Sequence, residues 1–442
     1  MSCMNITKSL FVLIILCFAV VSRSEIKTTL QLDSLSFLSP DYENTDKKSF
    51  GFVGATLASD HNNPDLFMLN LTGVYAVGQS VLSYLNIREI YFTYQIDSNS
   101  KIHVGRKLFN WSSLDSDWNL GFYQPQFRWN PINPENQGLT GIFWERNEPI
   151  WGLTLFASPV YVPDQGPGYE LKDGQFERSN PWFSNPPQNI RFQGQLFPID
   201  YNIHRPETSD VIFQQVYSAS LRLGERKGFF TNVAGSFKPA HQLALAYKPV
   251  LVTTRVRVDV TPKVYLENIY SADLGYRDSW GLAQFSVLYT KPQTPDFQPG
   301  YSVPILDESI SFGPKFVYNI RPFQFGISYL DTIGGEVKES GPDVSADRAS
   351  LTQRFLFRQA AQLNVTYRDI LYKKILLESG VQWRQSTKDE FTELRFKNRL
   401  DIRGPWSFWA DVILIETADK TLSNMGSYRN LDQVWIGAGY DI

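Results

Sequence analysis

The stretch Glu393-Leu-Arg-Phe-Lys-Asn-Arg-Leu-Asp-Ile402 alternates charged side chains with a second set that is almost wholly apolar. In a strand, successive side chains point to opposite faces, so the charged groups would share one face and the apolar groups the other. In a helix, the same spacing would scatter charge around the axis and leave no apolar stripe. The stretch is therefore predicted to be a strand, either in a soluble antiparallel sheet or in a membrane barrel with lipid outside and water inside.

The N-terminus has the features of a secretory signal peptide. The run Leu10–Val21 is apolar without interruption, and Ser22 and Ser24 suit the small-residue positions of a cleavage site. A run of this length is too short to cross a bilayer as a helix. We therefore expect residues 1–24 to be removed and residues 25–442 to form one domain.

Both cysteines, Cys3 and Cys17, lie inside the predicted signal. A mature chain without cysteine has no disulfide, no thiolate metal ligand and no cysteine nucleophile. A lipoprotein signal that uses Cys17 is disfavoured, because Leu16 is bulky where lipid-attachment sites take a small residue. The net charge of −3 gives no indication of a nucleic-acid partner.

Segments of the same alternating kind recur along nearly the whole chain, from Thr28–Leu38 to Leu431–Ile442. Many run for about 9–14 residues, the length that a tilted strand needs to cross a bilayer. In Val252–Val260 and Leu351–Tyr367, arginines oppose apolar side chains. Short turns alternate with long loops, and aromatic residues make up 14 % of the chain, which the interfacial girdles of a barrel would explain.

The chain ends in a further alternating segment whose apolar positions include Tyr440 and Ile442. This segment resembles the C-terminal assembly signal of bacterial outer-membrane β-barrels, although Ile442 stands where that family most often has Phe or Trp. The run Val104–Lys107, followed by Trp111 and the Asn-Pro pairs of 130–134, is similar to a strand and loop of large substrate porins and polysaccharide-export barrels. The resemblance implies location in the outer membrane of a Gram-negative bacterium, with outer-membrane lipid and the barrel assembly machinery as partners.

Together these features predict an all-β protein, a transmembrane antiparallel up-and-down barrel of about 16–20 strands, with 18 as the central expectation. The segment 242–260 would be one bulged strand or two. A soluble, secreted array of β-sandwiches is the alternative fold.

In a barrel, the charged side of each strand faces the lumen, and these residues tilt towards positive charge. The predicted pore-lining residues are Arg255, Arg257, Arg354, Arg358, Glu393, Arg395, Lys397 and Arg399. One hypothesis is a preference for anionic solutes, since rings of fixed charge set selectivity. The alternative is that the charges pair across strands and leave the lumen merely wet.

The loop 110–138 carries Trp111, Trp118, Trp129 and Arg128. One hypothesis is that it folds into the lumen as a constriction whose rings stack on sugar faces. The alternative is an aromatic belt or ordinary packing.

The predicted function is a porin-like channel for diffusion or facilitated transport of small hydrophilic solutes, possible classes being anions and saccharides. A surface-binding barrel with a plugged lumen, such as an adhesin or a polysaccharide-associated protein, is the alternative, and a barrel enzyme is a third. The four histidines, His61, His103, His204 and His241, are widely spaced, so no catalytic residue, metal site or cofactor is predicted.

Overall fold

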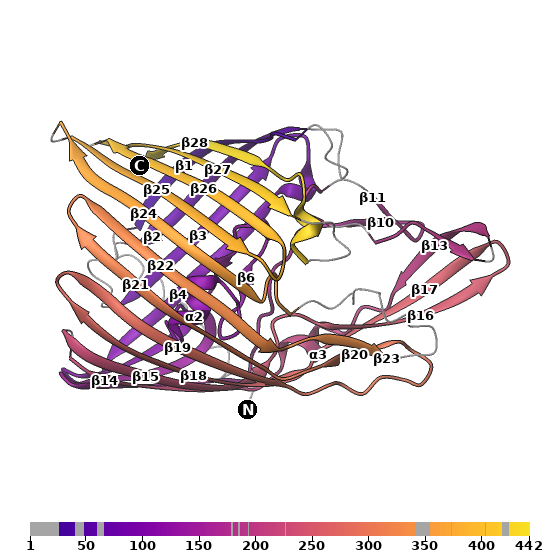
Figure 1. The fold of residues 1–442 in the computed structure, drawn as a ribbon, viewed down its shortest axis with the longest axis horizontal. Coiled ribbons are helices and arrows are strands. Elements are labelled where there is room, and N and C mark those ends of the chain that lie inside the picture. The colour runs from indigo at the N-terminus through magenta and orange to yellow at the C-terminus, as the bar shows by residue number, and fades with distance from the viewer. Residues whose placement is uncertain are drawn as a thin grey trace, which may run out of the picture.

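The computed structural model describes residues 26–39, 48–59, 66–177, 180–183, 186–192, 194–225, 227–340, 354–372, 374–402, 404–417 and 424–442. The predicted signal peptide lies outside the described residues. Eighteen strands form one closed sheet (Figure 1), in which β1 pairs with both β2 and the last strand, β28. All pairings around this barrel are antiparallel, as in β1–β28, where Leu32 lies opposite Ala438. The structure confirms the predicted barrel and its 18 strands.

The barrel strands have the following bounds: β1 Ile26–Phe37, β2 Ser49–Ser59, β3 Phe67–Ala76, β4 Tyr84–Gln95, β5 Ser100–Lys107, β8 Leu139–Asn147, β9 Trp151–Ser158, β14 Val216–Gly224, β15 Gly228–Pro239, β18 Leu266–Asp278, β19 Gly281–Pro292, β21 Ser309–Ile320, β22 Phe323–Gly334, β24 Gln359–Leu371, β25 Ile375–Ser386, β26 Phe391–Ile402, β27 Trp406–Thr417 and β28 Gln433–Asp441.

The remaining elements lie in the connections between barrel strands. They are η1 Ser80–Leu82, α2 Ser113–Trp118, β6 Gln126–Phe127, β7 Glu135–Asn136, β10 Glu170–Lys172, β11 Gln175–Glu177, β12 Asn189–Phe192, β13 Gln195–Ile203, α3 Thr208–Ile212, β16 Ala244–Val252, β17 Arg255–Lys263, β20 Val303–Leu306, β23 Val337–Ser340 and η2 Asn424–Tyr428. None of the helices in these described ranges is long and apolar enough to span a membrane.

The two rims of the barrel differ in the length of their connections. At one rim, tight turns such as 279–280 and 321–322 join neighbouring strands. At the other, the connections include 108–138 and 159–215. β1 begins and β28 ends at the rim with the short turns, because an even number of antiparallel strands returns the chain to its starting side. This is the layout of outer-membrane barrels, in which short turns face the periplasm and long loops the exterior.

The alternation of each strand sorts its side chains between lumen and lipid. In β26, Glu393 is 1 % exposed and Arg395 contacts the loop inside the barrel, whereas Leu400 and Ile402 are 38 % and 39 % exposed. Many other large apolar side chains are exposed on the barrel strands, among them Leu32, Tyr75, Leu274 and Ile436. Monomeric soluble proteins rarely expose so much contiguous apolar surface, and in a membrane lipid covers it. The closed barrel therefore belongs in the outer membrane, as predicted.

One predicted barrel segment is not part of the wall. Val252–Val260 falls largely in β17, which pairs with β16 and β13 in a four-stranded sheet. Figure 1 shows this sheet extending beyond the long-loop rim. The segment 242–260 is thus two strands, joined by a turn at which Thr253 has φ 45°. Its alternation was ambiguous because a sheet with one covered face has the same period as a barrel strand.

Candidate functional site in the barrel lumen

The connection 108–138, here called the lumen loop, crosses the inside of the barrel. Its Tyr123 hydroxyl lies 2.9 Å from Ser271 Oγ on β18, and Lys315 on β21 donates to Asp117 at 2.6 Å. On the opposite side, Arg395 of β26 donates to Asn133 at 2.7 Å. Contacts to strands so far apart in the sheet place the loop across the lumen, where the sequence analysis expected a constriction.

Local hydrogen bonds hold the first half of the lumen loop in shape. Ser112 caps α2 by accepting from the Asp115 amide, and Asn119 ends the helix in the left-handed conformation at φ 50°. The Asp115 carboxylate accepts from the amides of Phe122 and Tyr123 at 2.9 and 3.0 Å. Burial raises the pKa of Asp115, although these two donors act in the opposite sense.

The tryptophans of the lumen loop are core residues. Trp111, Trp118 and Trp129 are 1 %, 3 % and 5 % exposed. Trp111 packs against Phe143 and Phe156 of the wall, and Trp129 against Phe52. Such burial favours the alternative of ordinary packing over sugar stacking, and the stacking role stays a prediction for these three rings. They belong to an apolar cluster that also includes Phe52, Phe143 and Phe156 of the barrel wall.

A narrow gap of about 40 Å³ remains between the lumen loop and residues 354–357 with their neighbours. Four arginines line it, and none of the described residues that line it carries a carboxylate. They are Arg128 of the loop, Arg354, Arg384 of β25 and Arg395 of β26. Trp118 also lines the gap. The structure thus gathers two predicted pore residues and two predicted loop residues at one place.

The gap arginines are held by carboxylates that lie behind them. Glu393 is 3.4 Å from Arg384 and 3.3 Å from Arg395, while Glu267 is 3.6 Å from Arg354. The Arg384 guanidinium also lies over Trp118, 5.6 Å from the ring centroid. The Nε atoms of Arg354 and Arg395 have no hydrogen-bond partner among the described residues. The guanidinium groups are therefore held in place, and Arg384 and Arg395 share the single carboxylate of Glu393.

Arg128 belongs to a second buried pair. Its guanidinium lies 3.7 Å from Asp164 Oδ2, and the other oxygen of Asp164 accepts from the Gln126 amide at 2.8 Å. Burial raises the pKa of Asp164 to about 6, although Arg128 acts to lower it. The pair joins the lumen loop to the long connection that follows β9.

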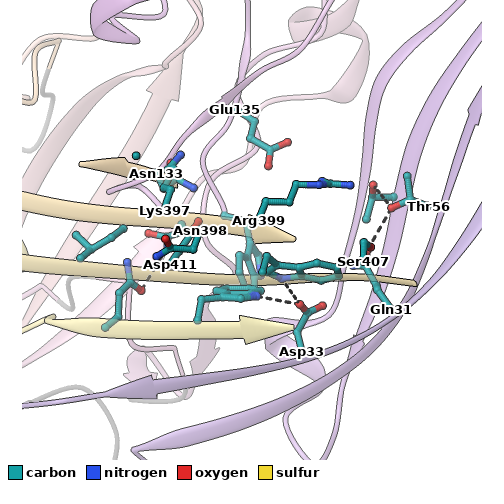
Figure 2. A pocket seen from close by; sticks show the side chains of 18 of the residues that line it. Gln31, Asp33, Thr56, Asn133, Glu135, Lys397, Asn398, Arg399, Ser407 and Asp411 are labelled. Carbon is teal, nitrogen blue, oxygen red and sulfur yellow. Dashed lines mark hydrogen bonds between the residues drawn. The ribbon is translucent and has the colours of Figure 1, made fainter. Parts of the chain in front are cut away.

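A second cavity, of about 620 Å³, lies on the other side of the segment 130–135 and is here called the vestibule (Figure 2). Asn130, Asn133 and Glu135 of this segment line the vestibule, while Pro131, Ile132 and Pro134 line the gap. The vestibule wall carries Lys397, Arg399 and several hydroxyl and amide groups from β1, β2, β3 and β27. A solute would meet polar groups there and arginines at the gap.

The predicted pore residues occupy three environments. Glu393, Arg395, Lys397 and Arg399 lie on the lumen side of β26, and Arg354 lies at the gap. Arg358 pairs with Glu336 in the long-loop connections, at 3.1 Å. Arg255 and Arg257 lie on β17, outside the barrel sheet, and pair with Asp200 and Asp259. Assigning these two arginines to the pore was wrong, because β17 has strand periodicity without belonging to the wall.

Several residues that line the lumen were not predicted from the sequence. Asp33, Trp409 and Trp435 line the vestibule together, although they come from β1, β27 and β28. Their positions on the lumen side of each strand could be read from parity. Their proximity depends on barrel closure, which brings β28 beside β1.

The histidines in the described ranges, His103, His204 and His241, each contact a polar side chain. His103 lies 2.9 Å from Thr93 Oγ1 and 3.5 Å from Glu145, and His241 lies 2.7 Å from the Tyr161 hydroxyl. No group of three or more His, Cys, Asp or Glu residues that could hold a metal occurs among the described residues.

Comparison with known proteins finds solved structures with a similar fold. No protein-family model matches the sequence, and no curated protein matches it. Solved structures that resemble the chain include Acinetobacter baumannii OccAB1, with 10 % identity over 94 % of this chain and 96 % of that one, at TM-score 0.48. Pseudomonas aeruginosa OccD3 (OpdP) is 12 % identical over 94 % and 91 %, also at 0.48. A BenF-like porin from Pseudomonas fluorescens Pf-5 is 9 % identical over 95 % and 99 %, at 0.45. These likenesses are too low for function to be carried from those proteins to this chain.

Proposed function

We propose that this protein is a porin-like channel of the outer membrane that passes small hydrophilic solutes and favours those bearing a carboxylate or another anionic group. The observation that carries the proposal is the arginine-lined gap between the lumen loop and the wall. Fixed charge acts most strongly where a pore is narrowest and water is scarce. Four guanidinium groups with no carboxylate among them would attract an anionic group at that point.

The vestibule is compatible with a route for polar solutes. Its wall offers Thr29, Gln31, Thr56 and Ser407 as hydrogen-bonding groups. Such groups replace part of the hydration shell of a solute without adding net charge. Passage from the vestibule to the exterior then depends on small movements of the lumen loop at the gap.

Ion selectivity of the purified, full-length protein in planar bilayers tests the proposal. We expect the reversal potential in a salt gradient to show anion preference, and the double variant Arg384→Gln/Arg354→Gln to lose much of it. The matched control is Arg255→Gln/Arg257→Gln, which removes the same charge from β17 outside the barrel and should change nothing. Cation preference of the wild type, or equal effects of both double variants, would contradict the proposal.

A surface-binding barrel is the second candidate, and one feature favours it. The sheet containing β16 and β17 extends past the long-loop rim (Figure 1), and the lumen loop packs against the barrel wall through a large apolar cluster. If the protein inserts into bilayers but conducts no ions, the channel proposal fails and the surface-binding function is favoured.

A further inference from the structure

Asp33 is a buried carboxylate that faces the vestibule with one oxygen unused. The residue is 8 % exposed, and its Oδ1 accepts from the indole nitrogens of Trp409 and Trp435 at 2.9 and 3.0 Å (Figure 2). No described residue donates a hydrogen bond to its Oδ2. A carboxylate withdrawn from water normally has an ion pair or several donors, because its desolvation is costly. Two neutral donors on one oxygen leave this charge without a counter-ion.

A glycine in the neighbouring strand leaves room for the Asp33 carboxylate and the Trp409 ring. A Cβ atom at Gly437 of β28 would overlap both Asp33 Oδ1 and the Trp409 ring. Only a residue without a side chain leaves room there for the carboxylate and indole together. The position of Asp33 is therefore specified by its neighbours.

The charges of the vestibule leave Asp33 unpaired. Lys397 lies directly opposite Asp411 in the β26–β27 register, and Arg399 binds Asp401 at 2.9 Å. Glu378, also in the lining, lies 3.8 Å from Arg368. Each of these cations thus has an acidic neighbour of its own.

Glu135, another carboxylate of the lining, also has no direct ion pair among the described residues. Glu135 of the lumen loop accepts from the neutral Asn86 amide at 3.0 Å, and no ion pair joins it to a described residue. Asp33 comes from the wall and Glu135 from the lumen loop (Figure 2). Both carboxylates add negative charge to the vestibule, and neither forms a direct ion pair with a described residue.

Aromatic rings surround the same space. Tyr84, Phe127, Trp129, Trp409 and Trp435 all line the vestibule. The faces and edges of such rings provide a polarisable surface, and their faces attract cations. A charged amine satisfies both features, since its N–H groups can bond a carboxylate while its carbon atoms contact the rings.

We propose that Asp33, Trp409 and Trp435 form a binding subsite for the ammonium group of a small organic cation. The subsite lies in the vestibule, separate from the arginines of the gap. It would recognise an amine on the solute, whereas the gap arginines would recognise an anionic group. It deepens the proposed function by adding an amine to the solute class, yet binding at this subsite does not require that the barrel conduct.

Binding to the full-length protein in detergent micelles tests the subsite directly. The probes are 1,5-diaminopentane, 1,5-pentanediol and glutarate, which share a length and differ in their end groups. Calorimetry, with tryptophan fluorescence as a second readout, should show the diamine binding more tightly than the diol. Its affinity should fall with added salt, as expected for a charge interaction.

The variant Asp33→Asn keeps the shape and the acceptor for both indoles but removes the charge. We expect it to weaken diamine binding about tenfold or more, as for loss of one partner of a buried charge pair. The matched control Asp411→Asn removes a carboxylate of the same cavity that already faces Lys397, and should have less than about a threefold effect.

The proposal fails if Asp33→Asn binds the diamine as the wild type does, or if the diol binds as tightly as the diamine. Equal binding of glutarate at this site would also overturn it. Retained heat modifiability on unboiled gels confirms that each variant is folded. Diamine binding without bilayer conductance would sustain the subsite while refuting the channel, so the two failures can be told apart.

Discussion

At the scale of single residues, the lumen combines buried charges whose partners come from distant parts of the chain. Glu393 forms ion pairs with both Arg384 and Arg395, and Asp164 forms one with Arg128. A buried charge that loses its partner is costly, so such pairs fix geometry even where they add little net stability. They hold guanidinium groups at the gap with few alternative positions.

Asp164 should make the stability of the protein depend on pH. Its pKa in the folded state is raised to about 6, above the ordinary value of 3.8. The stabilising effect of its proton is therefore fully present below about pH 4 and is lost as pH rises through 6, a change of roughly 3 kcal/mol at most. Asp164→Asn should flatten the dependence of the unfolding temperature between pH 4 and 6. An unchanged pH profile would show that Asp164 does not titrate in this window.

At the scale of elements, the lumen loop is anchored to the wall on several sides. The pair between Asp117 and Lys315 ties α2 to β21, and Tyr123 bonds β18. The barrel strands themselves are held by long ladders of backbone hydrogen bonds, so the loop is the element whose movement would change the gap.

Lys315→Gln should loosen the lumen loop without touching the gap arginines. We expect single-channel currents to fluctuate more between levels, with anion preference unchanged, because a partly buried pair is lost at one anchor only. Lys172→Gln breaks an exposed pair with Glu177 in the β10–β11 hairpin and serves as the control. Identical current records for Lys315→Gln and wild type would show that this anchor does not restrain the loop.

At the scale of the whole molecule, the outer surface of the barrel is apolar, whereas the wall of the vestibule carries mostly polar and charged groups. On β26, the apolar residues Leu394, Phe396, Leu400 and Ile402 share the lipid-facing parity, while Lys397 and Arg399 of the other parity line the vestibule. The cost of a charge on each face should therefore differ sharply.

Phe396→Arg should destabilise the protein by about 2–4 kcal/mol, the cost of an arginine on the lipid face near the bilayer centre. Thr366→Arg places the same group on the vestibule wall, where water solvates it, and should cost far less. The measurement is unfolding by denaturant in lipid vesicles. Equal losses for the two variants would mean that the faces are assigned wrongly.

The sequence by itself determined the strand periodicity, the two faces of most strands and the class of fold. These follow from nearest-neighbour geometry, because alternation along a strand is a local property. The lumen faces of β26 were readable in this way, and so was a long aromatic loop after β5.

Only the tertiary structure decided which strands enter the wall and which residues meet. Arg255 and Arg257 have the pattern of a barrel strand, yet pairing with β13 places them outside. The gap arginines come from four separate segments, and Asp33 meets Trp409 and Trp435 because closure joins β1 to β28. Long-range pairing and closure are set by the whole sheet, and no local pattern contains them.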